Sequence, residues 1–322
     1  MKRANGLTEA MSTDPRARFT AVQLRLLRHY HVEAESRYVE IDDPRLRLHL
    51  LEAGRGEPAV IFHGGDGQGV DWAPLLAQLQ PDFHLFSVDR PGFGLSDRFD
   101  YRRTDVRRHA VQLVDGILNA LGLESATLIG GSMGGFFALA FALSCPQRVR
   151  KLILVGMPAG ITSTAPLALR IACAVPGATR LMMRRLVGPT MQPRKQQYQK
   201  MFRADVARIP ELYFEMQAAG LAIPGAAQTW AVLLRRLVGL RGMRPEMVLV
   251  PELPQLAVQT LVLWGEHDMI PAAAGREAAA TIPGARFVLI PGVGHFPFLE
   301  APVRCAELIR EFARVRPGQL AA

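Results

Sequence analysis

The sequence predicts an α/β fold in which a mainly parallel, doubly wound sheet of eight strands carries an inserted helical cap. Three observations support this prediction. Eight short runs are either continuously apolar or alternate between apolar and polar residues, as strands do. Segments with helical periodicity separate several of these runs, and such alternation favours a parallel sheet. One long interval, residues 158–250, contains no run typical of a buried strand.

The predicted strands fall into two groups. The first two alternate between faces and are joined at Asp42-Asp43-Pro44, so we expect a hairpin that forms an antiparallel edge. The others are short apolar runs, which are typical of strands buried on both faces. The eight predicted strands are Tyr38–Ile41, Leu46–Leu50, Ala59–Phe62, His84–Val88, Thr127–Ile129, Leu152–Val155, Thr260–Leu263 and Phe287–Ile290.

The expected helices have apolar residues at helical spacing. One of them, Arg16–His31, precedes the first strand and has basic residues between its apolar positions. We expect its apolar face to pack on the core or the cap, with contact to a membrane surface or a second copy as the alternative. The other predicted helices are Ala73–Leu79, Asp105–Leu121, Phe136–Leu143, Ala272–Ala280 and Val303–Arg314.

The long interval without strands divides the chain. About 90 residues are too many for a structureless loop, so we predict a mostly helical cap at 158–250. The core is then built from 37–157 and 251–322, and residues 1–36 form an N-terminal extension that contains the amphipathic helix.

Composition excludes several classes of protein. The 322 residues are 49% hydrophobic and 21% charged, which is typical of a globular chain and not of a disordered one. Lys and Arg exceed Asp and Glu by 38 to 29, for a net charge of +9. No nucleic-acid-binding motif accompanies this excess, so we expect no nucleic-acid partner. The three cysteines, Cys145, Cys173 and Cys305, are far apart and predict neither a disulfide framework nor a zinc site.

Targeting signals are not evident. The chain begins Met1-Lys2-Arg3 without an apolar segment behind it, so we expect no secretory signal and a cytoplasmic protein. Residues 126–145 are uncharged and about as long as a membrane-spanning helix. Four glycines within them would weaken such a helix, and we interpret this stretch as a buried strand, a sharp turn and a buried helix.

The sharp turn contains the most informative motif, Gly130-Gly131-Ser132-Met133-Gly134-Gly135. A Gly-x-Ser-x-Gly sequence between a strand and a helix is typical of a nucleophile elbow. Small residues are needed there because the two backbones approach closely. We expect the turn to expose the Ser132 hydroxyl and to aim the Met133 N–H at a developing oxyanion.

A second glycine-rich turn, His63-Gly64-Gly65-Asp66-Gly67, directly follows a predicted central strand. Its backbone can supply the second oxyanion donor, and we predict the N–H of Gly65, with that of Gly64 as the alternative. We expect the His63 side chain to brace the turn.

Two later segments supply a carboxylate and an imidazole. Asp268 follows the strand ending at Leu263, where a side chain faces the crevice and can orient a histidine; Glu266 is the rival carboxylate. His295 lies between glycines and aromatic residues just after the last strand. The chain order Ser132, Asp268, His295 is the order of a hydrolase triad on this type of sheet, so we predict His295 as the general base.

These four ordered motifs resemble the α/β-hydrolase fold superfamily, and the resemblance extends from about Tyr38 to Arg314. Residues 88–96 are also similar to the superfamily's Asp-x-x-Gly-x-Gly-x-Ser loop, in which we expect Asp89 and Ser96 to be structural. The resemblance implies a serine hydrolase that cleaves a small-molecule ester or lactone through an acyl-enzyme, without a metal or organic cofactor.

Other activities remain open. Meta-cleavage C–C hydrolases share the elbow but typically have Asn before the serine and Trp after the histidine, where this chain has Gly131 and Phe296. Haloperoxidase-like activity would use the same triad. A receptor that binds a ligand without turnover is the alternative from a different class.

We expect the cap to set specificity. Phe214 and Trp230, together with Phe296 from the core, are predicted to line an apolar substrate pocket, and Met201, Phe202, Met216 and Phe298 are further candidates. Peripheral membrane contact and a homodimer both stay open as partner hypotheses. The cap also carries an excess of arginines, which we interpret as a solvated face, with an anionic group or membrane surface as the alternative. These arginines are Arg170, Arg184, Arg185, Arg235 and Arg236.

Overall fold

A computed structural model describes residues 14–175, 177–186 and 191–315 of the chain. Its centre is an eight-stranded sheet with the strand order β1-β2-β4-β3-β5-β6-β9-β10. β2 pairs antiparallel with both β1 and β4, whereas all other neighbours are parallel. The predicted fold class, antiparallel edge included, is therefore confirmed. The strands are β1 (Ala34–Asp42), β2 (Arg45–Ala53), β3 (Glu57–Phe62), β4 (Phe83–Val88), β5 (Ala126–Gly130), β6 (Val149–Val155), β9 (Thr260–Gly265) and β10 (Arg286–Ile290).

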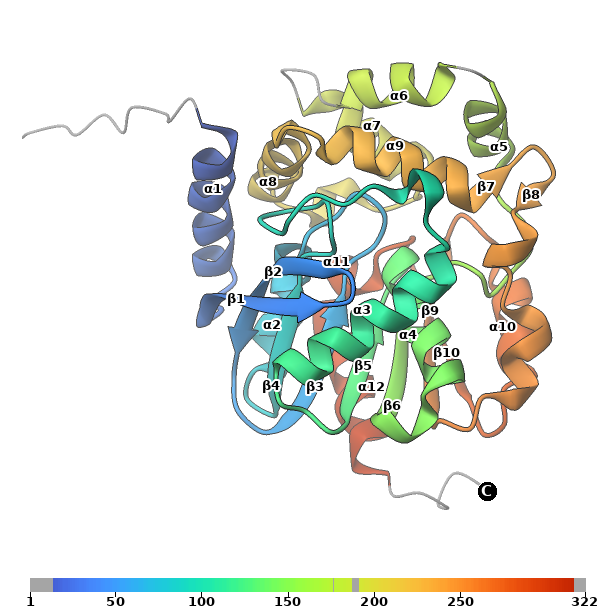
Figure 1. The fold of residues 1–322 in the computed structure, drawn as a ribbon. Coiled ribbons are helices and arrows are strands. Elements are labelled where there is room, and N and C mark those ends of the chain that lie inside the picture. Colours follow the sequence, from blue (N-terminus) through green and yellow to red (C-terminus); the bar gives the residue numbers. More distant parts are fainter. Residues whose placement is uncertain (1–13, 176, 187–190, 316–322) are drawn as a thin grey trace, which may run out of the picture.

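Helices cover both faces of the sheet (Figure 1). Alternate residues of one strand point to opposite faces, so Val60 belongs to one core layer and Ile61 to the other. The first layer includes α3 (Val106–Ala120), α4 (Met133–Ser144) and α10 (Ala272–Ala280). The second includes α2 (Ala73–Leu79), α11 (Pro297–Glu300) and α12 (Pro302–Arg314).

The interval between β6 and β9 is mainly helical and lies over the carboxyl ends of the parallel strands (Figure 1). It also contains a short hairpin of β7 (Val238–Gly239) and β8 (Gly242–Met243). Each strand has only two residues, too few to leave a periodic pattern in the sequence. The helices are α5 (Leu167–Ala174), α6 (Ala178–Leu186), α7 (Gln192–Lys200), α8 (Glu211–Ala222) and α9 (Ala226–Leu237).

The N-terminal helix α1 (Pro15–His29) packs along α8 of the cap. Its apolar residues Phe19 and Leu26 are fully buried, and Arg25 forms an ion pair with Glu215 of α8 at 2.8 Å. Asp14 caps the helix by accepting hydrogen bonds from the backbone N–H groups of its first turn. The apolar face of α1 is thus covered within the chain.

The uncharged stretch 126–145 forms β5, the turn and α4, as the glycines predicted. Within the described ranges, no helix combines the length and the apolar character that crossing a membrane would require. Cys145 is half-buried, Cys173 and Cys305 are buried, and all three are free thiols.

Candidate active site

Ser132 lies at the turn between β5 and α4 with φ 51° and ψ −120°, a backbone conformation that costs a non-glycine residue free energy. Close packing around the turn enforces this geometry. A Cβ on Gly130 would lie 2.5 Å from the carbonyl oxygen of Gly134, and one on Gly134 would lie 2.0 Å from that of Phe62. The glycines therefore allow strand and helix to meet, and the serine is placed at the start of α4.

The imidazole and the carboxylate predicted from separate segments lie together. His295 Nδ1 is 2.8 Å from Asp268 Oδ1, and both side chains are buried. Asp268 Oδ2 accepts a hydrogen bond from the backbone N–H of Met157 at 3.0 Å. Because Asp268 occupies Nδ1, the other ring nitrogen of His295 is left to exchange a proton.

The rival carboxylate lies elsewhere. Glu266 is exposed, and its Oε2 accepts a hydrogen bond from the backbone N–H of Gly292 at 2.8 Å. It therefore stabilises the turn before His295 without contacting the imidazole ring. His267 is exposed as well.

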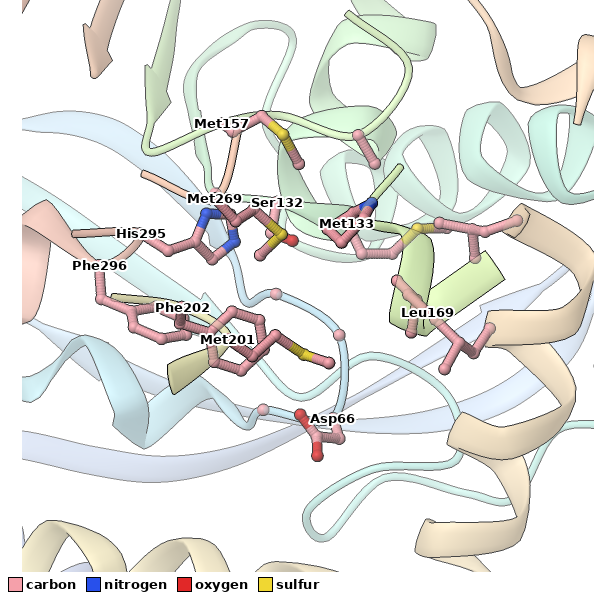
Figure 2. A pocket seen from close by; sticks show the side chains of 18 of the residues that line it. Asp66, Ser132, Met133, Met157, Leu169, Met201, Phe202, Met269, His295 and Phe296 are labelled. Carbon is pink, nitrogen blue, oxygen red and sulfur yellow. The ribbon is translucent and has the colours of Figure 1, made fainter. Parts of the chain in front are cut away.

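Ser132 and His295 line the same cavity, together with Met133, Gly64 and Gly65 (Figure 2). Gly64 lies close to the serine, since a Cβ on it would be 3.3 Å from Ser132 Cβ and 3.9 Å from Ser132 Oγ. The N–H of Met133 belongs to the first residue of α4, and such groups have no acceptor within their own helix. Backbone donors and a hydroxyl thus border one space.

The glycine-rich turn is held from behind by Arg90, which is fully buried. Arg90 Nη2 donates to the carbonyl oxygens of Gly64 and Gly65, each at 2.7 Å, and Nε donates to that of His63 at 3.1 Å. In a trans peptide the C=O and N–H groups point in opposite directions. The N–H groups of Gly64 and Gly65 therefore point away from Arg90.

His63 braces the turn, as the sequence predicted. Its Nδ1 donates to the carbonyl of Gly64 at 2.8 Å, and its Nε2 accepts from the backbone N–H of Arg90 at 2.9 Å. Burial, reinforced by the charge of Arg90, holds the pKa of His63 well below its ordinary value. The imidazole is therefore neutral at pH 7, with Nδ1 as a hydrogen-bond donor and Nε2 as an acceptor.

Asp89 and Ser96 are structural. Asp89 accepts hydrogen bonds from His49 Nδ1 at 2.7 Å and from the backbone N–H groups of Gly69 and Leu95. Ser96 Oγ donates to the carbonyl of Asp89 at 2.6 Å. This network joins β2, β4 and the turn before α2, and none of its groups lines the cavity.

Sequence reasoning missed Glu300, a buried carboxylate five residues after His295. Its oxygens accept from the backbone N–H of Gly294 at 3.1 Å and from that of Phe296 at 3.4 Å, on either side of His295. They also accept from the N–H of Asp205 at 2.9 Å. Burial raises the pKa of Glu300. The signal available in the sequence was an acidic residue within an apolar run.

The cavity is mostly apolar and is shared by core and cap (Figure 2). Trp230 and Phe296 line it, as predicted, together with Met201, Phe202 and Phe298. The ring of Trp230 packs against Gly65, where a Cβ would come within 2.7 Å of the indole.

The prediction that Phe214 and Met216 line the pocket is wrong. Phe214 and Met216 are fully buried and do not line the cavity. Both belong to the core layer that includes α1, and the Phe214 ring packs edge-on against Tyr198, with centroids 5.4 Å apart. Phe214 thus joins α8 to α7, and Met216 is buried in the same core layer.

One end of the cavity is polar and reaches into the interface of core and cap. Arg194 of α7 is buried and donates to Asp66 Oδ2 at 2.5 Å and to the side-chain oxygen of Gln217. Gln217 Nε2 donates to Asp71 Oδ1 at 2.6 Å. Burial raises the pKa of Asp71 to about 8, whereas Arg194 stays charged. Among the described residues, no group of three His, Cys, Asp or Glu side chains could hold a metal ion.

Comparison with known proteins agrees with this architecture. Residues 59–308 match the model of a family described as the alpha/beta hydrolase family. The chain belongs to this family. A relative of the hydrolase is the 2-hydroxy-6-oxo-6-phenylhexa-2,4-dienoate hydrolase of Burkholderia cepacia, which is 29% identical over 273 residues, covering 81% of this chain and 90% of that protein.

Solved structures share the fold of the hydrolase. The carboxylesterase CesB from Bacillus subtilis superimposes with a TM-score of 0.74 at 22% identity, over 93% of this chain and 98% of that one. The 2-hydroxy-6-oxo-6-phenylhexa-2,4-dienoate hydrolase from Rhodococcus sp. strain RHA1 gives a TM-score of 0.73 at 21% identity, over 88% of this chain and all of the other (100%).

Proposed function

We propose that this hydrolase cleaves a carboxylic ester or lactone of a largely apolar small molecule, with Ser132 as the nucleophile. The observation that carries the proposal is the meeting of Ser132, His295 and two backbone donors at one cavity, with Asp268 hydrogen-bonded to the imidazole. Chemistry of this kind requires a hydroxyl, a base and an oxyanion site within reach of the same carbonyl.

In the first half-reaction, His295 Nε2 takes the proton of Ser132 while Oγ attacks the ester carbonyl carbon. The N–H groups of Met133 and Gly65 stabilise the negative oxygen of the tetrahedral intermediate. Protonated His295 then donates its proton to the leaving alkoxide, the C–O bond breaks and an acyl-enzyme remains. Asp268 stabilises the imidazolium and keeps the ring in the orientation that this transfer needs.

In the second half-reaction, water takes the place of the alcohol. His295 removes a proton from the water as it attacks the acyl carbon, and the same backbone donors hold the oxyanion. Collapse of the intermediate returns the proton to Ser132 Oγ and releases the carboxylic acid. The apolar lining, with Met201 and Trp230, suits an apolar acyl or alcohol group.

Hydrolysis of a C–C bond is the second candidate, because curated relatives carry the name of a dienoate hydrolase. Two positions favour ester cleavage instead. Gly131 stands where the C–C hydrolases typically have Asn, and a Cβ on it would lie 2.6 Å from the carbonyl oxygen of Val155. Phe296 stands where they typically have Trp, and its ring stacks on Tyr198, with centroids 4.7 Å apart.

A fluorophosphonate label and a panel of p-nitrophenyl esters of increasing acyl length test the proposal. Wild type should be labelled once and turn over esters, whereas Ser132→Ala should lose labelling and at least a thousandfold in kcat. Ser144→Ala, at the other end of the same helix, is the control and should keep both. Turnover of 2-hydroxy-6-oxo-6-phenylhexa-2,4-dienoate without ester turnover would support the second candidate. A Ser132→Ala variant with wild-type ester turnover would contradict the nucleophile.

A further inference from the structure

Aliphatic side chains gather on the outer surface of the cap. We define the cap tip as α5 with Val175, α6, and the turn between β7 and β8. Five of the eight large hydrophobic residues that are exposed in the described chain belong to it. Single exposed aliphatic residues are ordinary, but a gathered set indicates an interaction surface. The five are Leu167 (63% exposed), Ile171 (47%), Val175 (49%), Leu181 (54%) and Leu240 (62%).

The residues of α5 separate into an outer and an inner face. Leu167 and Ile171 are four residues apart and therefore lie on one side of the helix, exposed. Leu169 lies on the opposite side and lines the active-site cavity (Figure 2). Arg170 Nε donates to the carbonyl oxygen of Leu240 at 2.7 Å, which fixes the β7–β8 turn beside α5. One short helix thus separates the outer aliphatic surface from the cavity.

The charge of the same region has a single sign. Between Pro158 and Ala204 the sequence contains no Asp or Glu. Arg180, Arg184 and Arg185 of α6 are exposed, and Arg184 and Arg185 follow Leu181 by three and four residues, on its side of the helix. The complete set of Lys and Arg in this interval is Arg170, Arg180, Arg184, Arg185, Arg194, Lys195, Lys200 and Arg203.

We infer that the cap tip docks on the surface of an anionic lipid bilayer. Exposed aliphatic side chains can enter the interface between headgroups and acyl chains, while arginines beside them bind lipid phosphates. Figure 1 shows α5 and α6 at the outer end of the cap, away from the carboxyl-terminal helix α12.

Charge disfavours a second copy of the chain as the partner of the cap tip, and the aliphatic side chains disfavour a nucleic acid. A symmetric dimer through this surface would bring two cationic tips together. A nucleic acid would satisfy the arginines but would leave Leu167, Ile171 and Leu240 without an apolar partner. An anionic bilayer is complementary to both the charge and the aliphatic side chains.

Sedimentation with vesicles tests the inference. The Ser132→Ala variant of the full chain serves as the background, so that lipid is not consumed and the result does not depend on the proposed reaction. We expect binding to vesicles of phosphatidylglycerol and phosphatidylcholine, weak binding to phosphatidylcholine alone, and at least a tenfold loss on raising NaCl from 50 to 500 mM.

Two sets of substitutions locate the surface. Leu167→Gln with Ile171→Gln, and separately Arg184→Glu with Arg185→Glu, should each weaken the partition coefficient at least tenfold. The matched control for the arginine variant is Arg55→Glu with Arg150→Glu. It makes the same change in net charge as Arg184→Glu with Arg185→Glu, at exposed positions near the amino ends of β3 and β6. It should weaken binding by no more than twofold. Circular dichroism melting curves verify that each variant is folded.

Several results would overturn the inference. They are no binding to anionic vesicles, an equal loss in the control, and no loss in either cap-tip variant. Tighter retention on DNA than on vesicles, lost in the Arg184/Arg185 variant, would assign the surface to nucleic acid instead. A dimer in light scattering that the Leu167/Ile171 variant abolishes would assign it to a second copy.

Discussion

The backbone N–H of His295 donates to the carbonyl oxygen of Phe202 at 3.0 Å, and the Phe202 ring stacks on the imidazole with centroids 5.3 Å apart and planes 15° apart. Phe202 belongs to the cap and covers a face of the imidazole, whereas Asp268, hydrogen-bonded to Nδ1 at the edge of the ring, belongs to the core. The proposed base is therefore positioned from both parts of the molecule. A displacement of the cap segment around Phe202 would displace the imidazole.

Phe202→Ala should lower kcat about tenfold with a smaller change in KM, because it removes the stacked ring while the main-chain hydrogen bond to His295 remains. Steady-state kinetics on the best ester of the panel measure both constants. Met201→Ala is the neighbouring control, since Met201 lines the cavity. It should raise KM and leave kcat within about threefold. A Phe202→Ala variant altered only in KM would argue against a positioning role.

Asp268→Asn should reduce kcat by about a thousandfold or more, because the amide can hold His295 in the wrong tautomer and cannot stabilise the imidazolium. Glu266→Gln should stay within about twofold, since the contacts of that exposed side chain are with the backbone N–H of Gly292 and with the exposed His267. Rates from the two single variants and the double variant test this directly. A comparable loss in Glu266→Gln would show that the second carboxylate takes part.

Arg90→Met should lower kcat at least tenfold with little change in KM, because three carbonyl oxygens lose the guanidinium as a donor, of which that of Gly64 keeps only His63, and the N–H groups of the turn lose their orientation. Arg90→Lys should recover part of the rate, since an ammonium can reach some of these carbonyls but cannot match the guanidinium fork. Kinetics are measured well below the melting temperature of each variant. Equal rates in Lys and Met variants would leave Arg90 a purely structural role.

Stability should fall with rising pH because of Asp71. Its folded-state pKa of about 8 lies above the value of an unfolded aspartate, so the folded state binds the extra proton between about pH 4 and 8. The contribution of Asp71 is complete below that window and is lost as pH rises through it, by at most about 1.4 kcal/mol per pH unit. The free energy of unfolding, measured by urea denaturation at pH 5, 6.5 and 8, should fall less steeply with pH for Asp71→Asn than for wild type. Parallel slopes would contradict this assignment.

Ser132→Gly should raise the free energy of unfolding by about 1 kcal/mol while abolishing turnover, because glycine adopts φ 51° without the penalty that serine incurs. Chemical denaturation of Ser132→Gly and Ser132→Ala separates relief of strain from loss of the hydroxyl. Only the glycine variant should gain stability. Equal stability of the two variants would mean that the elbow stores no strain.

Local patterns account for what the sequence predicted well. The elbow around Ser132, the turn at Gly64 and the segments carrying Asp268 and His295 each combine a strand end with turn residues, and parallel strands bring such ends to one edge. Arg90 and Glu300 were not assigned because their hydrogen bonds depend on which segments meet in three dimensions. Their own sequence surroundings do not reveal those partners.

The error at Phe214 has a different cause. α8 is buried on nearly all sides, between α1 and the rest of the cap, so its hydrophobic pattern has no preferred face. Nothing in such a pattern says which residues face a cavity and which face another helix. α9, by contrast, has a clear apolar face, and Trp230 was placed correctly.

The packing of α1 on α8 also has a consequence for biosynthesis. α1 leaves the ribosome well before α8, the helix that covers it, which begins only at Glu211. Phe19 and Leu26 therefore stay uncovered while most of the chain is being translated. A nascent chain stalled before residue 211 would expose the apolar face of an arginine-rich helix. Holdase chaperones bind segments of this kind.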